Sequence, residues 1–226
     1  IYLVISAVFI GYTPILSIDA STQSVYHFSD TDKNISLLDI SETFGTYDGS
    51  FVLYDNNLDS WKIYDLEEAT KRIPPESTYK IYDALLGLES GIITPEHSSM
   101  TWNGDAFPFP SWEADQDLNS AMQNSVNWYF QAIDSQLGIN RVQEFLNKIE
   151  YGNQTTSSNL DLYWSDFSLK ISPLEQVTLL KKFNTNEFHL NFQNVFSVKN
   201  AIKIASTPNG NFYGKTGTGR GNGQHI

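Results

Sequence analysis

A serine and a lysine lie three residues apart in the stretch PPESTYKIYDALL, which runs from Pro74 to Leu86. On a helix, residues three apart share one face, so the amine of Lys80 is expected beside the hydroxyl of Ser77. A lysine amine that burial keeps neutral can act as the base that activates a serine for acyl transfer. An ordinary helix start explains the same residues, with Ser77 or Thr78 as the cap and Lys80 in solvent.

Two later motifs favour the catalytic interpretation. One is SVN at residues 125–127, and the other is KTGT at residues 215–218. Together with the first stretch they form, in chain order, the S-x-x-K, S-x-N and K-T-G set of penicillin-recognising serine proteins, with K-T-G on a strand. The glycine-rich segment around Lys215 does not have the spacing of a phosphate-binding loop.

These motifs suggest a role for each polar side chain of the predicted site. Ser77 is the expected nucleophile and Lys80 is its base. Ser125 is expected to relay a proton, while Lys215 supplies positive charge near a substrate carboxylate or near the Ser125 hydroxyl. The backbone N–H groups of Ser77 and Thr218 are expected to stabilise the oxyanion.

Two strands and a helix are the first elements that must position this site. Phe51 to Tyr54 and Trp61 to Tyr64 are aromatic and β-branched runs on either side of an Asn-Asn turn. This pattern predicts a β-hairpin. A helix that begins at Ser77 follows, so the domain is expected to start with strand, strand and helix.

Two further helices have clear signals. Residues 139–151 repeat apolar side chains at helical spacing, and Gly152 is expected to end this helix. The segment SPLEQVTLLKKF begins with Ser172 as cap, Pro173 at the first helical position and Glu175 three residues after the cap, which predicts a capping box. Packing alone accounts for both helices. The apolar positions of the first are Val142, Phe145, Leu146 and Ile149.

Composition indicates a globular protein with an acidic balance. The 226 residues are 40% hydrophobic and 14% aromatic, which suffices for a packed core, and the formal net charge is -12. The sequence has no basic stripe, so a nucleic-acid partner is not expected. It has no cysteine, and its four histidines lack ligand spacing, so neither disulfides nor a metal site are expected.

The first 18 residues, IYLVISAVFIGYTPILSI, carry no charge. About 18 residues at 1.5 Å each nearly cross a hydrocarbon core of roughly 30 Å, so residues 1–18 are predicted to form a transmembrane helix. A buried core helix and a signal peptide are the alternatives, although a signal peptide begins with Met and a basic patch whereas this sequence starts at Ile1. That start suggests a piece of a longer protein. Residues 19–44 are predicted to be a polar tether, and residues 45–226 the folded domain.

The motifs STYK, WNG, SVN, YGN and KTGT together resemble the serine penicillin-binding superfamily, and within it the class D β-lactamases. The resemblance covers about Gly45 to Gly221. It implies an α+β fold in which helices flank an antiparallel sheet and a helical subdomain carries Ser125. In class D proteins the motif lysine, here Lys80, is N-carboxylated by carbon dioxide, and a tryptophan matching Trp164 helps to hold the carbamate; no other cofactor is implied. The expected substrate-binding residues are Asn127, Thr216, Gly217, Thr218 and Trp164.

A narrower resemblance is to the extracellular sensor domain of β-lactam receptors of the BlaR/MecR type. The segments that carry it are DGSFVLYD, STYKIYDALLGL, QDLNSAMQNSVNWYF, SLKISPLEQV and YGKTGTG. It implies a receptor at the cell membrane, anchored through residues 1–18, which binds β-lactams outside the cell and signals across the membrane to induce resistance. It also implies an upstream zinc metalloprotease domain as partner, although this sequence contains no His-Glu-x-x-His.

The third residue of the SVN motif bears on the choice between sensor and hydrolase. The receptors have Asn there, as Asn127 here, whereas class D hydrolases usually have an apolar residue. Asn127 is expected to compete for the hydrogen bonds of a carbamate on Lys80, so that carbon dioxide is lost and the acyl-serine persists. A polar loop residue that satisfies backbone groups is the alternative.

The predicted function is therefore a β-lactam sensor that is acylated at Ser77. A class D β-lactamase that hydrolyses the adduct shares every motif and remains the main alternative. A cell-wall transpeptidase and a binding protein that never acylates are the others.

The end of the sequence departs from the family pattern. The family domain continues past the K-T-G strand with a further strand and a closing helix, whereas this sequence ends at Ile226. An unpaired sheet edge and an uncovered apolar face are therefore expected to lower the stability of this chain.

Overall fold

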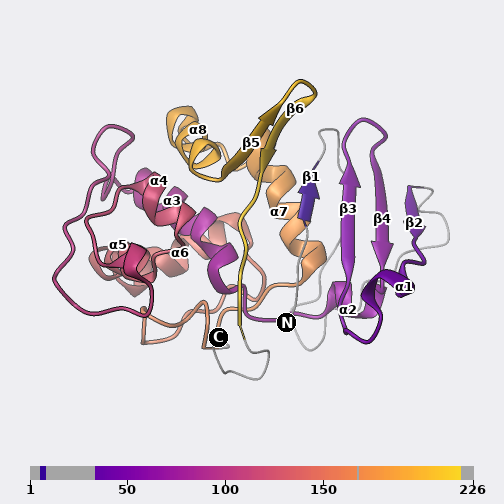
Figure 1. Cartoon of the computed structure of the whole chain (residues 1–226), viewed down its shortest axis with the longest axis horizontal. Helices are drawn as coiled ribbons and strands as arrows, with labels where there is room; N and C mark the ends of the chain where they lie inside the picture. The colour runs from indigo at the N-terminus through magenta and orange to yellow at the C-terminus, as the bar shows by residue number, and fades with distance from the viewer. Residues whose placement is uncertain (1–5, 9–33, 167, 220–226) are drawn as a thin grey trace.

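The structure divides into a sheet region and a helical body that lie side by side (Figure 1). The computed structural model describes residues 6–8, 34–166 and 168–219. The strands are β1 (Ser6–Val8), β2 (Ile35–Leu37), β3 (Phe51–Asp55), β4 (Ser60–Tyr64), β5 (Lys203–Thr207) and β6 (Gly210–Tyr213). The α-helices are α1 (Ser41–Phe44), α2 (Leu66–Thr70), α3 (Lys80–Glu89), α4 (Leu118–Gln123), α5 (Asn127–Leu137), α6 (Ile139–Ile149), α7 (Pro173–Thr185) and α8 (Phe192–Ala201). Two 3-10 helices are η1 (Glu76–Tyr79) and η2 (Pro110–Trp112).

The sheet region is built on the predicted hairpin, which is confirmed. Strands β3 and β4 pair antiparallel, with Phe51 opposite Tyr64 and Asp55 opposite Ser60. β1 and β2 pair in parallel with β3 and β4, so the sheet has the order β1-β3-β4-β2. The expectation of an antiparallel sheet is therefore wrong for the two outer pairings. Side-chain alternation predicts which face of a strand is buried, but the connections decide the direction of its neighbours.

The N-terminal prediction falls mostly on residues that the structure does not describe. Three residues of the predicted transmembrane helix, Ser6–Val8, form strand β1 beside β3. The rest of residues 1–18 and much of the tether lie outside the described residues, so the membrane helix stays a prediction. Within the described part of the chain, no helix is long and apolar enough to span a bilayer.

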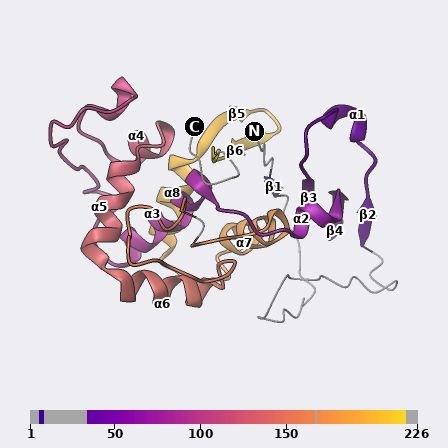
Figure 2. The same cartoon turned by 90° about the horizontal axis from the view of Figure 1, so that it is seen from below.

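Helix α7 packs on the sheet and lies between it and the helical body (Figure 2). Alternate residues of β3 and β4 are buried, as expected for strands with one covered face. They form a small core with residues of α2 and α7. Its members are Val52, Tyr54, Trp61, Ile63, Ala69, Leu174 and Val177.

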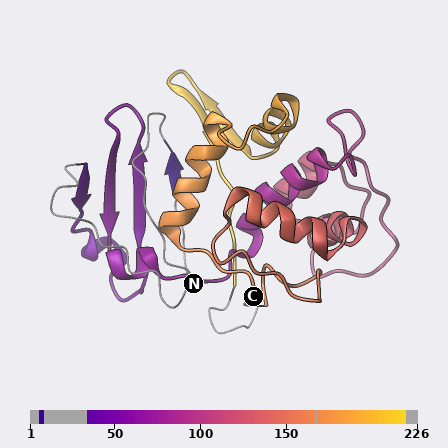
Figure 3. The same ribbon diagram turned by 180° about the vertical axis from the view of Figure 1, so that it is seen from behind.

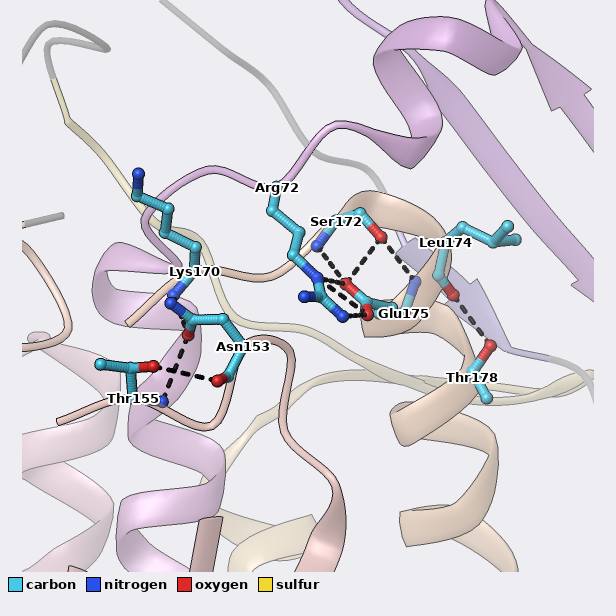
Figure 4. A network of polar contacts seen from close by, with 8 residues as sticks. All are labelled: Arg72, Asn153, Thr155, Lys170, Ser172, Leu174, Glu175 and Thr178. Atoms are coloured by element: carbon cyan, nitrogen blue, oxygen red, sulfur yellow. Dashed lines mark hydrogen bonds and ion pairs between the residues drawn. The ribbon is translucent and has the colours of Figure 1, made fainter. Parts of the chain in front are cut away.

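The start of α7 has the predicted capping box, and an arginine strengthens it. Ser172 Oγ accepts a hydrogen bond from the backbone N–H of Glu175 at 3.2 Å, and Glu175 Oε2 accepts one from the Ser172 N–H at 2.9 Å. The guanidinium of Arg72 donates to both oxygens of the same carboxylate (Figure 4). Because Arg72 lies between α2 and η1, this ion pair fixes the segment that leads into the S-x-x-K motif.

The helical body contains the larger core, with α3 at its centre (Figure 3). α3 packs against α5 and α8, and every one of its residues from Lys80 to Leu88 is buried. The predicted amphipathic helix is confirmed as α6, and all four of its apolar positions are buried. α3 is therefore enclosed on all sides, which places its first residue inside the protein.

Gly152 does not end α6 as predicted. The helix ends at Ile149, and Glu150 takes the left-handed conformation with φ 56°. Gly152, with φ 51°, instead passes so close to another segment that an added Cβ would lie 2.0 Å from the carbonyl oxygen of Lys170. Asn153 holds the same segment, since its Oδ1 accepts from the Lys170 N–H at 2.9 Å (Figure 4). The YGN motif thus fixes the position of the segment that contains Lys170.

The K-T-G motif does not lie on a strand. β5 and β6 form a separate two-stranded hairpin, and Lys215 follows β6 in an extended segment. This segment runs alongside η1 (Figure 1), where a Cβ on Gly217 would be 2.8 Å from the carbonyl oxygen of Pro75. The hairpin and α8 carry several exposed apolar side chains. They are Phe192, Phe196, Ile204, Phe212 and Tyr213.

We predict that Gly152→Ala lowers the free energy of unfolding by about 3 kcal/mol, through the left-handed conformation and the clash with Lys170. Gly91→Ala is the matched control, because Gly91 has φ 72° but nothing within 4 Å of an added Cβ. It should cost only about 1 kcal/mol. Thermal melts followed by circular dichroism test this, and equal losses in the two variants would contradict the role of the close approach.

Candidate active site

The serine and lysine of the first motif lie in contact where η1 meets α3. Ser77 lies in the 3-10 turn η1, so the α-helix begins at Lys80 and not at Ser77 as predicted. The Lys80 Nζ is 2.7 Å from Ser77 Oγ. Lys80 is 0% exposed, which excludes the alternative of a solvated lysine at an ordinary helix start.

The amine of Lys80 contacts polar and aromatic side chains from other segments. It donates to Asn127 Oδ1 at 2.6 Å and to Ser125 Oγ at 3.3 Å. It also lies 4.7 Å from the ring centroid of Trp164. Burial, together with the positive charge of Lys215, lowers the pKa of Lys80 to about 7. A substantial share of the amine is therefore neutral at physiological pH, as a general base requires.

Ser125 lies in the short loop between α4 and α5. Its backbone is left-handed, with φ 54°, and the buried Val126 holds the loop through an N–H bond to the Ala121 carbonyl at 2.9 Å. Lys215 Nζ donates to Ser125 Oγ at 2.9 Å, and burial lowers the pKa of Lys215 to about 8. The Ser125 hydroxyl thus lies between two lysine amines, where a proton can pass.

The K-T-G segment supplies the side of the site opposite the helical body. Lys215 also donates to the carbonyl of Thr216 at 2.9 Å. Thr216 and Thr218 are exposed, whereas Gly217 is half-buried against η1. A side chain at position 217 would push this segment away from Ser77, which explains the glycine.

Trp164 closes the inner end of the site. It is 2% exposed, and its backbone carbonyl accepts from the N–H of Glu76 at 3.0 Å. Its indole Nε1 is buried and finds no hydrogen-bond acceptor among the described residues. An unmatched buried donor is costly, so an acceptor is expected beside it. An oxygen bound to the neighbouring Lys80 amine, as in a carbamate, would be an acceptor of suitable chemistry.

Two acidic residues near the lysine were not predicted from the sequence. Asp83 lies one helical turn after Lys80, is fully buried, and has a pKa that burial raises well above its usual value. Burial also raises the pKa of Glu76, beside Ser77, to about 7, although the charge of Lys80 opposes this. An aspartate inside the apolar run IYDALL was the available signal for Asp83.

The structure brings the predicted site residues together from distant parts of the chain. Six side chains meet around the Lys80 amine or the Ser125 hydroxyl, and the remaining three residues lie on the adjoining segment. The first group is Ser77, Lys80, Ser125, Asn127, Trp164 and Lys215. The second is Thr216, Gly217 and Thr218. Their individual chemical roles stay predictions.

Comparison with known proteins agrees with this geometry. The profile of the penicillin binding protein transpeptidase domain matches residues 48–225. The chain is 44% identical over 224 residues to the regulatory protein BlaR1 of Bacillus licheniformis. The matched region covers 98% of this chain but only 37% of that protein. The chain therefore spans little more than a third of the length of this curated relative.

Two solved structures share the fold. The C-terminal domain of the Bacillus licheniformis BlaR penicillin-receptor superposes with a TM-score of 0.79 at 45% identity, covering 81% of this chain and 75% of that one. A class D β-lactamase from Bacillus subtilis superposes with a TM-score of 0.77 at 35% identity, covering 80% and 76%. The chain belongs to the penicillin-binding transpeptidase family, in the branch shared by the BlaR-type receptor domains and the class D β-lactamases.

Proposed function

We propose that this chain is the β-lactam-binding sensor domain of a BlaR/MecR-type membrane receptor, and that it keeps the antibiotic as a long-lived acyl-serine on Ser77. The observation that carries the proposal is the 2.6 Å contact between Asn127 Oδ1 and Lys80 Nζ. The similarity to the regulatory protein BlaR1 supports the same conclusion. In the whole receptor, we propose a membrane anchor at residues 1–18, an extracellular sensor, and an upstream metalloprotease domain that receives the signal.

Acylation proceeds through successive proton transfers between groups that are in contact in the site. The neutral amine of Lys80 takes the proton of Ser77 Oγ, and Oγ forms a bond to the β-lactam carbonyl carbon. The N–H groups of Ser77 and Thr218 stabilise the oxyanion. As the carbonyl–nitrogen bond breaks, Ser125 passes a proton to the ring nitrogen, and Lys215 restores the proton to Ser125. The charge on Lys215 also attracts the carboxylate of the antibiotic.

Asn127 decides the fate of the adduct in this proposal. Its carbonyl oxygen accepts from the Lys80 amine, and an acceptor at this distance stabilises the protonated form. A carbamate on Lys80, held by the free indole N–H of Trp164, would supply the base that activates water. Acylation leaves on Lys80 the proton taken from Ser77, and Asn127 stabilises this ammonium, which does not combine with carbon dioxide. Water then lacks a base, so the ester on Ser77 persists.

A class D β-lactamase is the second candidate, and one observation favours it. The buried Nε1 of Trp164 has no acceptor among the residues that the structure describes, which suits a stable carbamate on Lys80. A stable carbamate would activate water for hydrolysis of the adduct. The two functions therefore differ in the lifetime of one covalent bond.

The lifetime of the acyl-serine distinguishes the two functions. After a brief pulse of penicillin, intact mass spectrometry should detect one adduct per chain that persists for many minutes. Ser77→Ala should form none. Rapid loss of the adduct, with hydrolysed penicillin accumulating well beyond one equivalent, would identify a β-lactamase and overturn the sensor proposal.

We predict that Asn127→Val shortens the adduct lifetime by about tenfold or more, because a base for water becomes available. Asn127→Asp keeps an acceptor oxygen beside Lys80 and adds a negative charge that favours the ammonium, so its adduct should persist. The decay of the adduct mass after removal of free penicillin gives both lifetimes. An unchanged lifetime in Asn127→Val would show that this amide does not control deacylation.

The pH dependence of the acylation rate should reflect the protonation of both Lys80 and Lys215. The rate should rise as Lys80 loses its proton near pH 7, and fall above about pH 8 as Lys215 loses the charge that attracts the substrate. Lys215→Ala should abolish the alkaline limb. It should also move the acid limb to higher pH, because the charge of Lys215 lowers the pKa of Lys80. Stopped-flow acylation by a chromogenic cephalosporin measures these limbs, and a flat profile would rule out Lys80 as the base.

A further inference from the structure

An aromatic cluster lies beside the Ser125 loop and has no part in the chemistry above. Trp112, in η2, packs against Phe107 and Phe109, with ring centroids 5.7 and 5.3 Å apart. Trp112 is half-buried against the main core, whereas Phe109 is exposed. The cluster belongs to the long connection between α3 and α4, so its position relative to Ser125 depends on specific contacts.

Two hydrogen bonds connect Trp112 to the chain on both sides of the SVN motif. The indole Nε1 of Trp112 donates to the backbone carbonyl of Asn124 at 3.0 Å. The indole Nε1 of Trp128 donates to the backbone carbonyl of Trp112 at 2.9 Å. Asn124 directly precedes Ser125, and Trp128 directly follows Asn127. Trp112 therefore bridges the two ends of the motif.

The backbone of the SVN loop is strained at Ser125; α4 binds the N–H groups of Asn124 and Ser125, and Trp112 binds the Asn124 carbonyl. Ser125 has φ 54°, a left-handed conformation that side chains other than Gly, Asn and Asp adopt at a cost. The buried Val126 fixes the inner side of the loop. On the outer side Asn124 is exposed, and its carbonyl is held by Trp112.

The site has little tolerance for movement of this loop. Ser125 Oγ lies 3.3 Å from Lys80 Nζ and 2.9 Å from Lys215 Nζ, while Asn127 Oδ1 lies 2.6 Å from Lys80 Nζ. A shift of about 1 Å would take the first contact beyond hydrogen-bond range. The loop backbone must therefore be fixed for both side chains to act.

We propose that Trp112 is a positioning residue for acylation, whose indole N–H holds the Asn124 carbonyl so that Ser125 stays between the two lysine amines. The inference rests on the proposed acylation of Ser77 but not on the lifetime of the adduct. It applies to a sensor and to a β-lactamase alike. Trp112 acts through the loop backbone and does not itself touch the reacting atoms.

The test is Trp112→Phe, which keeps an aromatic ring in the cluster and removes the donor. The acylation rate constant at saturating penicillin should fall about threefold to tenfold, as expected for the loss of one net hydrogen bond. The dissociation constant of the initial, non-covalent complex should change less than about twofold, because the variant keeps an aromatic ring at this position. Both constants come from acylation rates measured over a range of penicillin concentrations in the full chain. Rates are expressed per site that labels at the end point, so that misfolded protein does not contribute.

Trp102→Phe is the matched control. Trp102 lies in the same connection, and its Nε1 also donates to a backbone carbonyl, that of Asp105 at 2.9 Å. That bond does not reach the SVN loop, so the acylation rate constant should be unchanged. Trp128→Phe removes the second bond of the bridge and should slow acylation in the same direction as Trp112→Phe.

A double substitution separates positioning from a general loss of packing. With Ser125→Ala already present, Trp112→Phe should have no further effect on the rate constant, since the group that it positions is gone. A normal rate constant in Trp112→Phe, an equal loss in Trp102→Phe, or full additivity with Ser125→Ala would overturn the inference while leaving the proposed function intact. Absence of any adduct in the unsubstituted chain would overturn both.

Discussion

The buried amine of Lys80 is the constraint on which the site depends. A charge enclosed in a core is costly unless polar partners surround it, and the penalty shows as a pKa lowered towards neutrality. The partners are Ser77 on the preceding turn, Ser125 in a loop 45 positions later, and Asn127 at the start of α5, 47 positions later. The body of the protein therefore has to enclose the first turn of α3 and still leave Ser77 accessible.

Close backbone contacts enclose the first turn of α3 and keep Ser77 accessible. The missing side chain of Gly217 allows the K-T-G segment to run against η1, and the missing side chain of Gly152 allows a close approach to the backbone of Lys170. The N–H of Glu76 bonds to the carbonyl of Trp164, which joins the segment of Trp164 to the turn that carries Ser77. The polar groups of the site are thus positioned in part by two glycines that take no part in the proposed chemistry.

Sequence patterns predicted the elements whose signals are local. Spacing within short stretches of the chain predicts the hairpin of β3 and β4, the buried stripe of α6 and the capping box at Ser172. Helical spacing likewise predicts the contact between Ser77 and Lys80. The order of the three motifs, together with the family resemblance, located the remaining site residues.

Features that depend on contacts between distant segments were missed or wrong. The parallel outer pairings of the sheet depend on how the chain connects its strands, which alternation does not encode. Gly152 is typical of a helix end in the sequence, but in the structure it packs against the backbone of Lys170, eighteen positions away. The tryptophan bridge around Ser125 has no sequence signature, because it joins an indole to a backbone carbonyl that every residue type possesses.

The hydrogen bond between Lys215 and Ser125 joins residues 90 positions apart, and that between Lys80 and Asn127 spans 47. Contacts of such high sequence separation form only when the loop-closure entropy of the intervening chain is overcome. During synthesis Ser125 emerges from the ribosome well before Lys215. On the proposed function, a chain that penicillin labels is therefore one in which these distant segments have already come together around Lys80.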